Sequence, residues 1–325
     1  MHSKEVEYFA KQDLHFEKII AKGGYGTIFY VYNKQYCNHF ALKKIPKELF
    51  NQSEIDCLLR LDDARIVSLY KYYHFHDHVY MLMEYCPSDL QKIIKQKTKV
   101  DREEYIKIVY DTIAAVKACH DRNIAHSDIK PSNFMIDQYG RVKIGDFGLS
   151  AIYSQHPTSG DFKGTRLFMA PEIFHYEKYN PMVADIWALG VTLYYFATEK
   201  YPFFCQDVDG LIHRIKSGQF NELLVRDEQL RDIIKRCLDP NPRNRPTCAQ
   251  LLDMPFFKTE PQGEELKENV KLNRLDVFTR SQNLIVKPKI NKPKNPLMIQ
   301  AGRIYKNAST LRLQMIIPPP PPDSI

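Results

Sequence analysis

A series of polar motifs, in one order along the middle of the chain, constrains its fold more than any other feature. Asp128, Lys130 and Asn133 fall at positions i, i+2 and i+5 of one short segment. Asp146–Gly148 (DFG) begins thirteen residues after Asn133, and Ala170–Glu172 (APE) follows it. Each motif alone is common on loops. All of them in this order and spacing indicate a functional site rather than a purely structural segment.

A second pattern near the N-terminus points to an anionic ligand. Gly23, Gly24 and Gly26 lie between two strand-like segments. Glycine lets backbone amides approach a phosphate closely because it has no Cβ, although an isolated glycine turn is more often structural. Lys43 lies on a strand-like segment downstream, where an unpaired charge would be costly to bury. Together they predict a phosphate-bearing ligand.

Composition is that of a globular protein. The 325 residues predict two lobes or domains. With 44% hydrophobic and 26% charged residues, the chain is neither wholly disordered, collagen-like nor a small disulfide scaffold. The seven cysteines form no CxxC pair, so we expect reduced thiols and no zinc site. The longest apolar stretch, residues 187–197, is shorter than the ~20 residues of a membrane span. We therefore expect a protein of the cytosol or nucleus, with no transmembrane segment.

Periodicity divides the body into two parts and predicts an α+β fold. The first 85 residues are mostly strand-like, and helical spacing dominates beyond residue 89. The predicted strands are 16–20, 27–32, 40–45, 79–85, 134–136 and 142–144. The predicted helices are 46–61, with Pro46 at its first position, and 101–120, 183–197, 208–217, 228–237 and 248–253.

With these motifs, the sequence resembles the eukaryotic protein kinase family over residues 14–257. The resemblance implies the bilobal protein kinase fold, with a small β-rich N-lobe at 14–85 and a larger α-helical C-lobe at 86–257. It also implies that ATP and Mg²⁺ bind in the cleft between the lobes. Residues 1–13 are then an N-terminal extension, and 258–325 a tail.

The resemblance assigns roles to the motif residues. Lys43 matches the lysine that holds the α- and β-phosphates, and Glu54 its ion-pair partner. Asp128 matches the residue that accepts the substrate hydroxyl proton, and Lys130 offsets charge on the transferred group. Asn133 and Asp146 are the implied Mg²⁺ ligands. The phosphate-covering loop comprises Ala21, Lys22, Gly23, Gly24, Tyr25, Gly26 and Ile28.

The same resemblance places the purine and braces the C-lobe. Adenine is expected between Ile28 and Ala41 above and Met135 below, with Met83 as gatekeeper. The hinge residues Glu84, Tyr85 and Cys86 would meet the purine through backbone groups, and Asp89 would reach the ribose. Thr165 is expected to hydrogen-bond the catalytic Asp and Lys, Asp185 to anchor the catalytic loop, and Glu172 to pair with Arg245.

Three positions depart from the family pattern. Ala21 replaces the first glycine of the loop, and the connection from Lys43 to Glu54 is eleven residues, shorter than in most members. Ser127 stands where most members carry an arginine that grips a phosphate on the activation loop, and the position usually phosphorylated holds Asp161. We expect activity that does not depend on phosphorylation at that position.

Function follows from the resemblance, with two alternatives. The segment 128–133 (DIKPSN) is typical of the serine/threonine branch, which implies a monomeric, non-specific serine/threonine protein kinase that phosphorylates protein substrates in signalling. A pseudokinase scaffold is one alternative; a small-molecule or antibiotic kinase, which the peptide platform at Gly164–Glu172 disfavours, is the other. The activation segment resembles that of calmodulin-dependent kinases, and Ser132 does not support an arginine preference in substrates.

The tail has a different composition. From Lys258 to the end there are 12 basic and 6 acidic residues and nine of the 20 prolines, five of them consecutive at Pro318–Pro322. We expect a disordered segment that offers a proline-recognition domain or an acidic partner a binding sequence. With few aromatic residues to stack on bases, it is not expected to bind nucleic acid.

Overall fold

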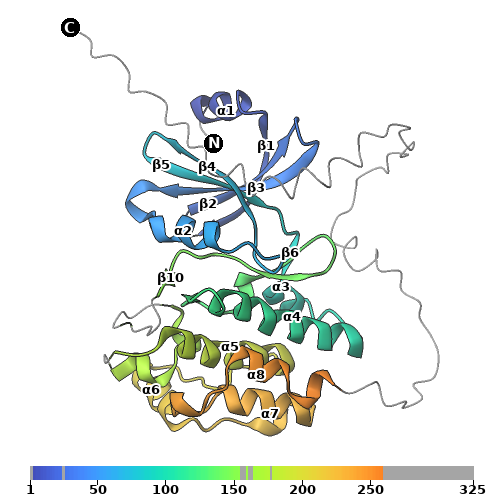
Figure 1. Cartoon of the computed structure of the whole chain (residues 1–325), viewed down its shortest axis with the longest axis vertical. Helices are drawn as coiled ribbons and strands as arrows, with labels where there is room; N and C mark the ends of the chain where they lie inside the picture. The colour runs from blue at the N-terminus through green and yellow to red at the C-terminus, as the bar shows by residue number, and fades with distance from the viewer. Residues whose placement is uncertain (1–2, 24–25, 154–158, 160–163, 176–177, 259–325) are drawn as a thin grey trace, which may run out of the picture. The chain divides into compact units, whose positions relative to one another are not determined.

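The computed structural model describes residues 3–23, 26–153, 159, 164–175 and 178–258 (Figure 1). Within the unit Met1–Gln262, a sheet of strands lies over a group of helices (Figure 1). The expected α+β fold, with a β-rich N-lobe and a helical C-lobe, is confirmed.

The N-lobe is a five-stranded antiparallel sheet in the order β1-β2-β3-β5-β4. In its register, Ile28 lies opposite Lys43, and Ala41 lies opposite Met83. Opposed residues share one face of a sheet, so these four side chains face the same side. The strands are β1 (Leu14–Gly23), β2 (Gly26–Asn33), β3 (Asn38–Pro46), β4 (Leu69–Phe75) and β5 (His78–Glu84).

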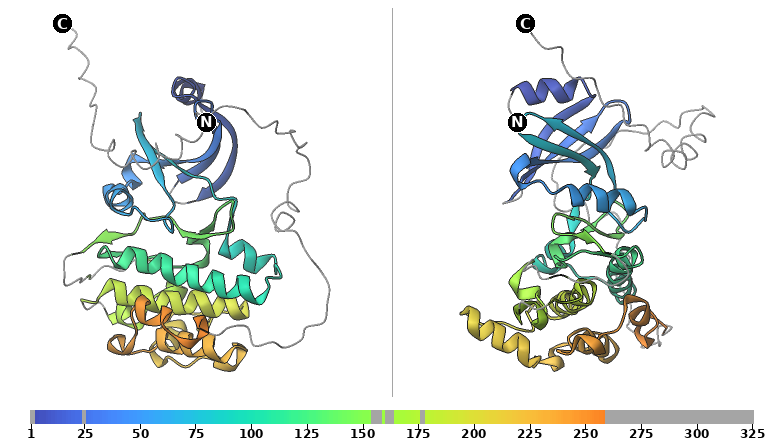
Figure 2. Two further views of the ribbon diagram at one scale, coloured as in Figure 1. Left: turned by 45° about the vertical axis from the view of Figure 1, so that its right-hand side comes forward. Right: turned by 60° about the vertical axis from the view of Figure 1, so that its left-hand side comes forward.

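Helix α1 (Ser3–Ala10) covers the opposite, aromatic face of this sheet (Figures 1 and 2). Phe9 is 2% exposed, and its ring centroid lies 5.4 Å from that of Tyr73 and 4.7 Å from that of Tyr80. The Glu5 carboxylate accepts hydrogen bonds from Lys44 on β3 and from the Tyr80 hydroxyl. The residues before the kinase-like region therefore complete the core of the N-lobe.

The helix predicted from Pro46 begins later. Pro46 is the last residue of β3, and α2 (Gln52–Arg60) starts after a short 3₁₀ turn, η1 (Lys47–Leu49). The Asn51 side chain accepts a hydrogen bond from the Ser53 amide and caps the helix. Asn is a strong N-cap, whereas Pro46 has strand partners, and this competition moves the start of the helix.

The C-lobe is built around two long helices, α4 (Arg102–His120) and α5 (Pro181–Thr198). Helix α4 packs against β9 and α8, and α5 packs against α7 (Figure 2). Helix α5 is apolar on nearly all faces; its Trp187 is fully buried and stacks on Phe203. The remaining helices are α3 (Leu90–Lys95), α6 (Val208–Ser217), α7 (Glu228–Cys237) and α8 (Cys248–Leu252).

Short strands at the top of the C-lobe hold the motif segments. They are β6 (Ser88–Asp89), β7 (Ile124–Ala125), β8 (Phe134–Ile136), β9 (Val142–Ile144) and β10 (Ala151–Ile152). Strands β6, β8 and β9 form one small sheet, and β7 pairs with β10. Short 3₁₀ turns complete the lobe: η2 (Pro131–Asn133), η3 (Arg166–Phe168), η4 (Pro171–His175), η5 (Glu222–Leu224), η6 (Pro242–Asn244) and η7 (Pro255–Phe257).

Two further observations concern the state of the cysteines and the lengths of the apolar helices. All seven cysteines are free thiols. Across the part of the chain that the structure describes, no helix combines the length and apolarity that a membrane crossing requires.

The packing of α1 makes a testable prediction about stability. Phe9→Ala should lower the free energy of unfolding by about 3–5 kcal/mol, because it leaves a cavity between α1 and the sheet. Val6→Ala, on the same helix but 41% exposed, should change it by less than about 0.5 kcal/mol. Urea denaturation measures both, and equal effects would show that α1 is not part of the core.

Candidate active site

A cavity of about 490 Å³ opens between the two lobes. Its lining includes most of the residues predicted for nucleotide binding. From the N-lobe and hinge these are Ala21, Lys22, Gly23, Gly26, Ile28, Ala41, Lys43, Glu84, Cys86 and Asp89. From the C-lobe they are Lys130, Asn133, Met135 and Asp146. Gly24 and Tyr25 lie outside the described residues.

The glycine pattern has a steric reason at Gly26. Its φ is +141°, and a Cβ there would lie 2.1 Å from the backbone oxygen of Lys44. Only glycine fits this approach of β2 to β3. Ala21 stands opposite Ile28 on the strand pair, directly after a register shift between Ile19 and Ala21, so the residue that replaces the first glycine is still paired within β1.

The apolar part of the cavity lies beside the hinge. Ala41 and Met83 face it from neighbouring strands, and Met135 faces it from β8. The backbone N–H and C=O of Cys86 make no hydrogen bond with any described residue. Because Cys86 lines the cavity, these groups are available to pair with a polar ring edge.

Two carboxylates that line the cavity at or near the hinge form ion pairs with lysines. Glu84 Oε2 lies 2.7 Å from Lys143 Nζ, and Lys143 is 5% exposed. The Asp89 carboxylate caps α3, accepting from the Lys92 amide at 2.8 Å, and also pairs with Lys92 Nζ at 3.1 Å. Asp89 lines the cavity, but its charge is already compensated.

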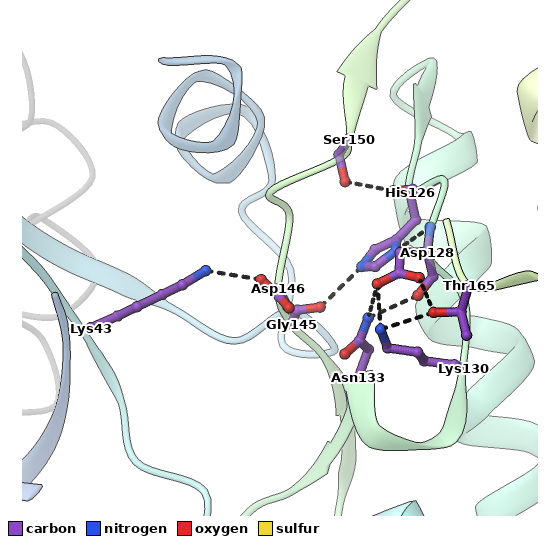
Figure 3. Close-up of polar contacts among 9 residues, drawn as sticks. All are labelled: Lys43, His126, Asp128, Lys130, Asn133, Gly145, Asp146, Ser150 and Thr165. Atoms are coloured by element: carbon purple, nitrogen blue, oxygen red, sulfur yellow. Dashed lines mark hydrogen bonds and ion pairs between the residues drawn. The ribbon is translucent and has the colours of Figure 1, made fainter. Parts of the chain in front are cut away.

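Lys43 connects three elements of the cleft, and Figure 3 shows its contact with Asp146. Its Nζ lies 2.7 Å from Glu54 Oε1 on α2 and 2.8 Å from Asp146 Oδ1. The eleven-residue connection is therefore long enough for the ion pair with Glu54. Phe147, which follows Asp146, is fully buried with its ring 4.9 Å from His126, so Asp146 is directed into the cleft.

Burial and charge act in opposite directions on this cluster. Burial alone lowers the pKa of the Lys43 ammonium, but the carboxylates of Glu54 and Asp146 outweigh it and raise that pKa. Burial alone raises the pKa of Asp146, but the positive charge of Lys43 holds it below its usual value. Lys43 is therefore cationic and Asp146 anionic at neutral pH.

Asp128 is surrounded by the other catalytic-loop residues (Figure 3). Lys130 Nζ donates to Asp128 Oδ2 at 2.6 Å, and the Thr165 hydroxyl donates to Oδ1 at 3.0 Å. Lys130 Nζ also lies 3.2 Å from Thr165 Oγ1, so the expected link of Thr165 to both residues is confirmed. The Asn133 amide donates to the Asp128 backbone oxygen at 2.8 Å. The same Asn133 amide lies 3.3 Å from Asp128 Oδ2, so three polar groups fix the orientation of one carboxylate.

The carboxylate of Asp185 holds the backbone of the catalytic loop through hydrogen bonds. Its carboxylate accepts from the amides of His126 and Ser127 at 2.8 and 2.9 Å, which confirms the expected anchor. Ser127 has a φ of +65°, a strained value for a residue with a Cβ, and the buried carboxylate stabilises it. His120 Nε2 also donates to Asp185, at 3.1 Å.

His126 links the loop to the DFG motif. Its Nε2 donates to the Gly145 carbonyl at 2.9 Å, and its Nδ1 accepts from the Asp128 amide at 3.3 Å. The Ser150 hydroxyl donates to the His126 carbonyl. These bonds define one tautomer of the imidazole and tie Asp128 to the backbone beside Asp146.

The expected brace of the C-lobe is also present. Arg245 pairs with both oxygens of Glu172, at 2.7 and 2.8 Å, and its guanidinium lies 5.0 Å from the Trp187 ring. Such a two-bond arrangement is stronger than a single ion pair. It fixes the APE segment against α5.

The oxygen groups of the cleft suit Mg²⁺ when phosphates are bound. Magnesium takes one or two protein oxygens and completes its shell with phosphates and water. Asn133 and Asp146 both line the cavity, and no described residue donates to Asn133 Oδ1. No group of three or more His, Cys, Asp or Glu side chains within the described ranges could hold a metal ion. A cation there would depend on phosphates.

Several lining residues were not predicted from the sequence: Val67, Pro87, Ser88, Lys92 and Gly145. Val67 reaches the cavity because its amide donates to the Ile144 carbonyl, 77 positions along the chain. No local motif marks such a contact. Gly145 adjoins Asp146, and Pro87 and Ser88 lie between Cys86 and Asp89, so proximity to predicted residues was the only available signal.

The pair of His120 and Asp185, which contacts the catalytic loop, predicts a pH dependence of the free energy of unfolding. Burial alone lowers the pKa of His120, but its interactions with Asp185 and Cys248 together outweigh burial and raise it to about 10. In the unfolded chain the value is about 6.5. The protonated form therefore stabilises the fold fully below pH 6.5, and this contribution decreases as the pH rises to 10.

Unfolding free energies from pH 6 to 10 test this. The native chain should lose more stability over that range than His120→Gln, which cannot titrate. Parallel curves for the two proteins would contradict a charged His120.

Comparison with known proteins agrees with this geometry. The model of the protein kinase domain family matches residues 14–257. The chain is 31% identical over 249 residues to sperm motility kinase 3A of Mus musculus, covering 75% of this chain and 49% of that protein. It is 28% identical over 317 residues to CBL-interacting serine/threonine-protein kinase 3 of Arabidopsis thaliana, covering 93% and 71%. The carbon catabolite-derepressing protein kinase of Candida glabrata is 30% identical over 275 residues, covering 79% and 44%. The chain belongs to the eukaryotic serine/threonine protein kinase family.

Proposed function

We propose that the chain is an ATP-dependent serine/threonine protein kinase that transfers the γ-phosphate of ATP to hydroxyls of protein substrates. The observation that carries this proposal is the set of contacts around Asp128. Lys130, Thr165 and Asn133 orient its carboxylate. Lys130 and Asn133 line the cleft that also contains Lys43 and Asp146. The chain spans about half the length of the first curated relatives it matches. The proposal therefore rests on this site and not on the activities of those longer proteins.

Each charged residue has one task in this reaction. Lys43, held by Glu54, binds the α- and β-phosphates and orients the nucleotide. Asp128 accepts the proton of the attacking hydroxyl, and Lys130 compensates charge on the transferred group. Asn133 and Asp146 would hold Mg²⁺, which neutralises phosphate charge when bound.

The cavity offers a place for each part of ATP. Ala41, Met83 and Met135 provide apolar contacts for the adenine, and the free backbone groups of Cys86 pair with its edge. Gly23 and Gly26 line the cavity at the ends of β1 and β2, where these strands would cover the phosphates. Asp89 is an acceptor for a ribose hydroxyl, shared with Lys92.

The two alternatives have different support. A pseudokinase lacks one or more of the charged groups, whereas here Lys43, Asp128 and Asp146 are all present and paired. A small-molecule kinase needs no peptide platform, whereas η3 and the segment after it pack against the C-lobe core beside Asp128.

We further propose a signalling role in the cytosol or nucleus as a monomer. The names of several relatives, such as the CBL-interacting kinases, state partners of those proteins. For this chain, the sequence of the tail supports a partner with a proline-recognition domain or an acidic surface.

Asp146→Asn tests the proposed reaction. The rate of phosphate transfer from Mg²⁺-ATP to a generic serine peptide should fall at least about 100-fold, because the change removes the charge that faces Lys43 and the metal. Asp209→Asn, an exposed carboxylate on α6, is the matched control and should retain the native rate. A native chain that binds Mg²⁺-ATP without transferring phosphate would instead support the pseudokinase.

Ser127 makes a second prediction, about regulation. With no cation before Asp128 to bind an activation-loop phosphate, phosphatase treatment should leave most of the activity intact. Mass spectrometry before and after treatment monitors the phosphate. A large loss of activity on its removal would contradict the prediction; Asp161 itself lies outside the described residues.

A further inference from the structure

Arg166 is an unpaired cation beside the catalytic carboxylate. It directly follows Thr165, whose hydroxyl lies 3.0 Å from Asp128 Oδ1. Its side chain is exposed and makes no ion pair or hydrogen bond with any described residue. Lys43 and Lys130, two cations of the catalytic cleft, are both bound to carboxylates.

The backbone holds Arg166 in place. Gly164, two residues before it, has a φ of +103°, and a Cβ there would lie 2.7 Å from the Ser127 carbonyl. Arg166 opens the turn η3, in which the Phe168 amide donates to Thr165 and the Met169 amide to Arg166. Phe168 and Met169 are buried. The guanidinium therefore extends from a fixed backbone next to the catalytic loop.

The carboxylates around the site already have basic partners. Asp146 is paired with Lys43, Asp89 with Lys92, and Glu84 with Lys143. Asp128 is paired with Lys130. Among the described residues that line the cleft, no carboxylate is left to attract a basic substrate, whereas Arg166 remains available to an acidic one.

A substrate hydroxyl that reaches Asp128 comes close to Arg166, because the preceding residue, Thr165, is hydrogen-bonded to Asp128. Successive residues of an extended peptide are about 3.3 Å apart. Consecutive Cα atoms are 3.8 Å apart, so the backbones of Thr165 and Arg166 are similarly close. A residue within about two positions of the accepted hydroxyl therefore comes within reach of the long guanidinium side chain.

We propose that Arg166 gives the enzyme a preference for an acidic residue, Asp or Glu, close to the phosphorylated Ser or Thr. This inference rests on the proposed kinase activity and adds the substrate class. An Arg–carboxylate contact forms two parallel hydrogen bonds, which gives it direction as well as strength.

The experiment uses the full chain and a short peptide with one serine among neutral residues. Asp is placed in turn at each position near the serine, and Asn at the same position is the uncharged control. At the best position, kcat/KM for the Asp peptide should exceed that for the Asn peptide by about tenfold. The ratio should fall at high salt because ions screen an exposed pair.

Substitutions at Arg166 connect the preference to this residue. Arg166→Ala should bring the Asp/Asn ratio to about one, and Arg166→Lys should retain part of it, since a lysine keeps the charge but not the two-bond geometry. Arg166→Glu should bring the Asp/Asn ratio below one, and a peptide with Lys at the same position should then be the better substrate. Arg226→Glu reverses an equally exposed and unpaired charge before α7, and should keep the native ratio. Thermal unfolding and Mg²⁺-ATP binding establish that each variant is folded.

The outcomes separate the two proposals. Phosphorylation of neutral peptides with no acidic preference, a preference for basic peptides, or an acidic preference that survives in Arg166→Glu would overturn the role of Arg166 and leave the kinase activity standing. No phosphorylation of any peptide by a folded, Mg²⁺-ATP-binding chain would overturn the proposed function, and this inference with it.

Discussion

One buried cation holds the reacting parts of this molecule together. Lys43 on β3 is bound by Glu54 on α2 and by Asp146, which is 103 positions away in the chain. Removal of one partner from such a buried group leaves a charge uncompensated, at a cost of about 3–5 kcal/mol. The N-lobe strand, the helix beside it and the start of the activation segment are therefore confined to one arrangement. The short connection from Lys43 to Glu54 accommodates this because α2 starts only after Asn51.

A second polar network prepares the catalytic loop. Asp185 is 2% exposed, yet its oxygens are satisfied by two backbone amides and by His120. A fully bonded buried carboxylate is rigid, since any displacement leaves a polar group without a partner. This rigidity keeps Ser127 in its strained conformation and, through it, sets the position of Asp128. The loop is thus ordered before any substrate binds.

Residues outside the family motifs adapt this common framework. Helix α1 precedes the region matched by the family and closes the aromatic face of the N-lobe sheet through Phe9 and Glu5. Lys143 neutralises Glu84 behind the hinge. Together with Lys92 on Asp89, this pairing compensates the carboxylates at the hinge side of the cleft.

The sequence by itself determined the features that depend on local order. Helices α6 and α7 and strands β8 and β9 have the predicted bounds, because period and N-cap residues such as Asp207 and Asp227 are local signals. Periodicity predicted the β-rich and α-rich parts, and the motifs selected residues of which most line one cavity, although their individual roles stay predictions. Glu54 and Asp128 do not line that cavity and are joined to it by their contacts with Lys43 and Lys130. Strand β4 was not predicted from the sequence. Only Leu69 and Tyr73 of its seven residues are buried, so this strand lacks the regular alternation of buried and exposed positions by which strands are predicted. What only the tertiary structure decided are contacts between distant segments: Val67 beside Ile144, Lys143 on Glu84, and α1 on the sheet. Their side chains carry no local pattern, since the partner of each is fixed only when the chain has folded.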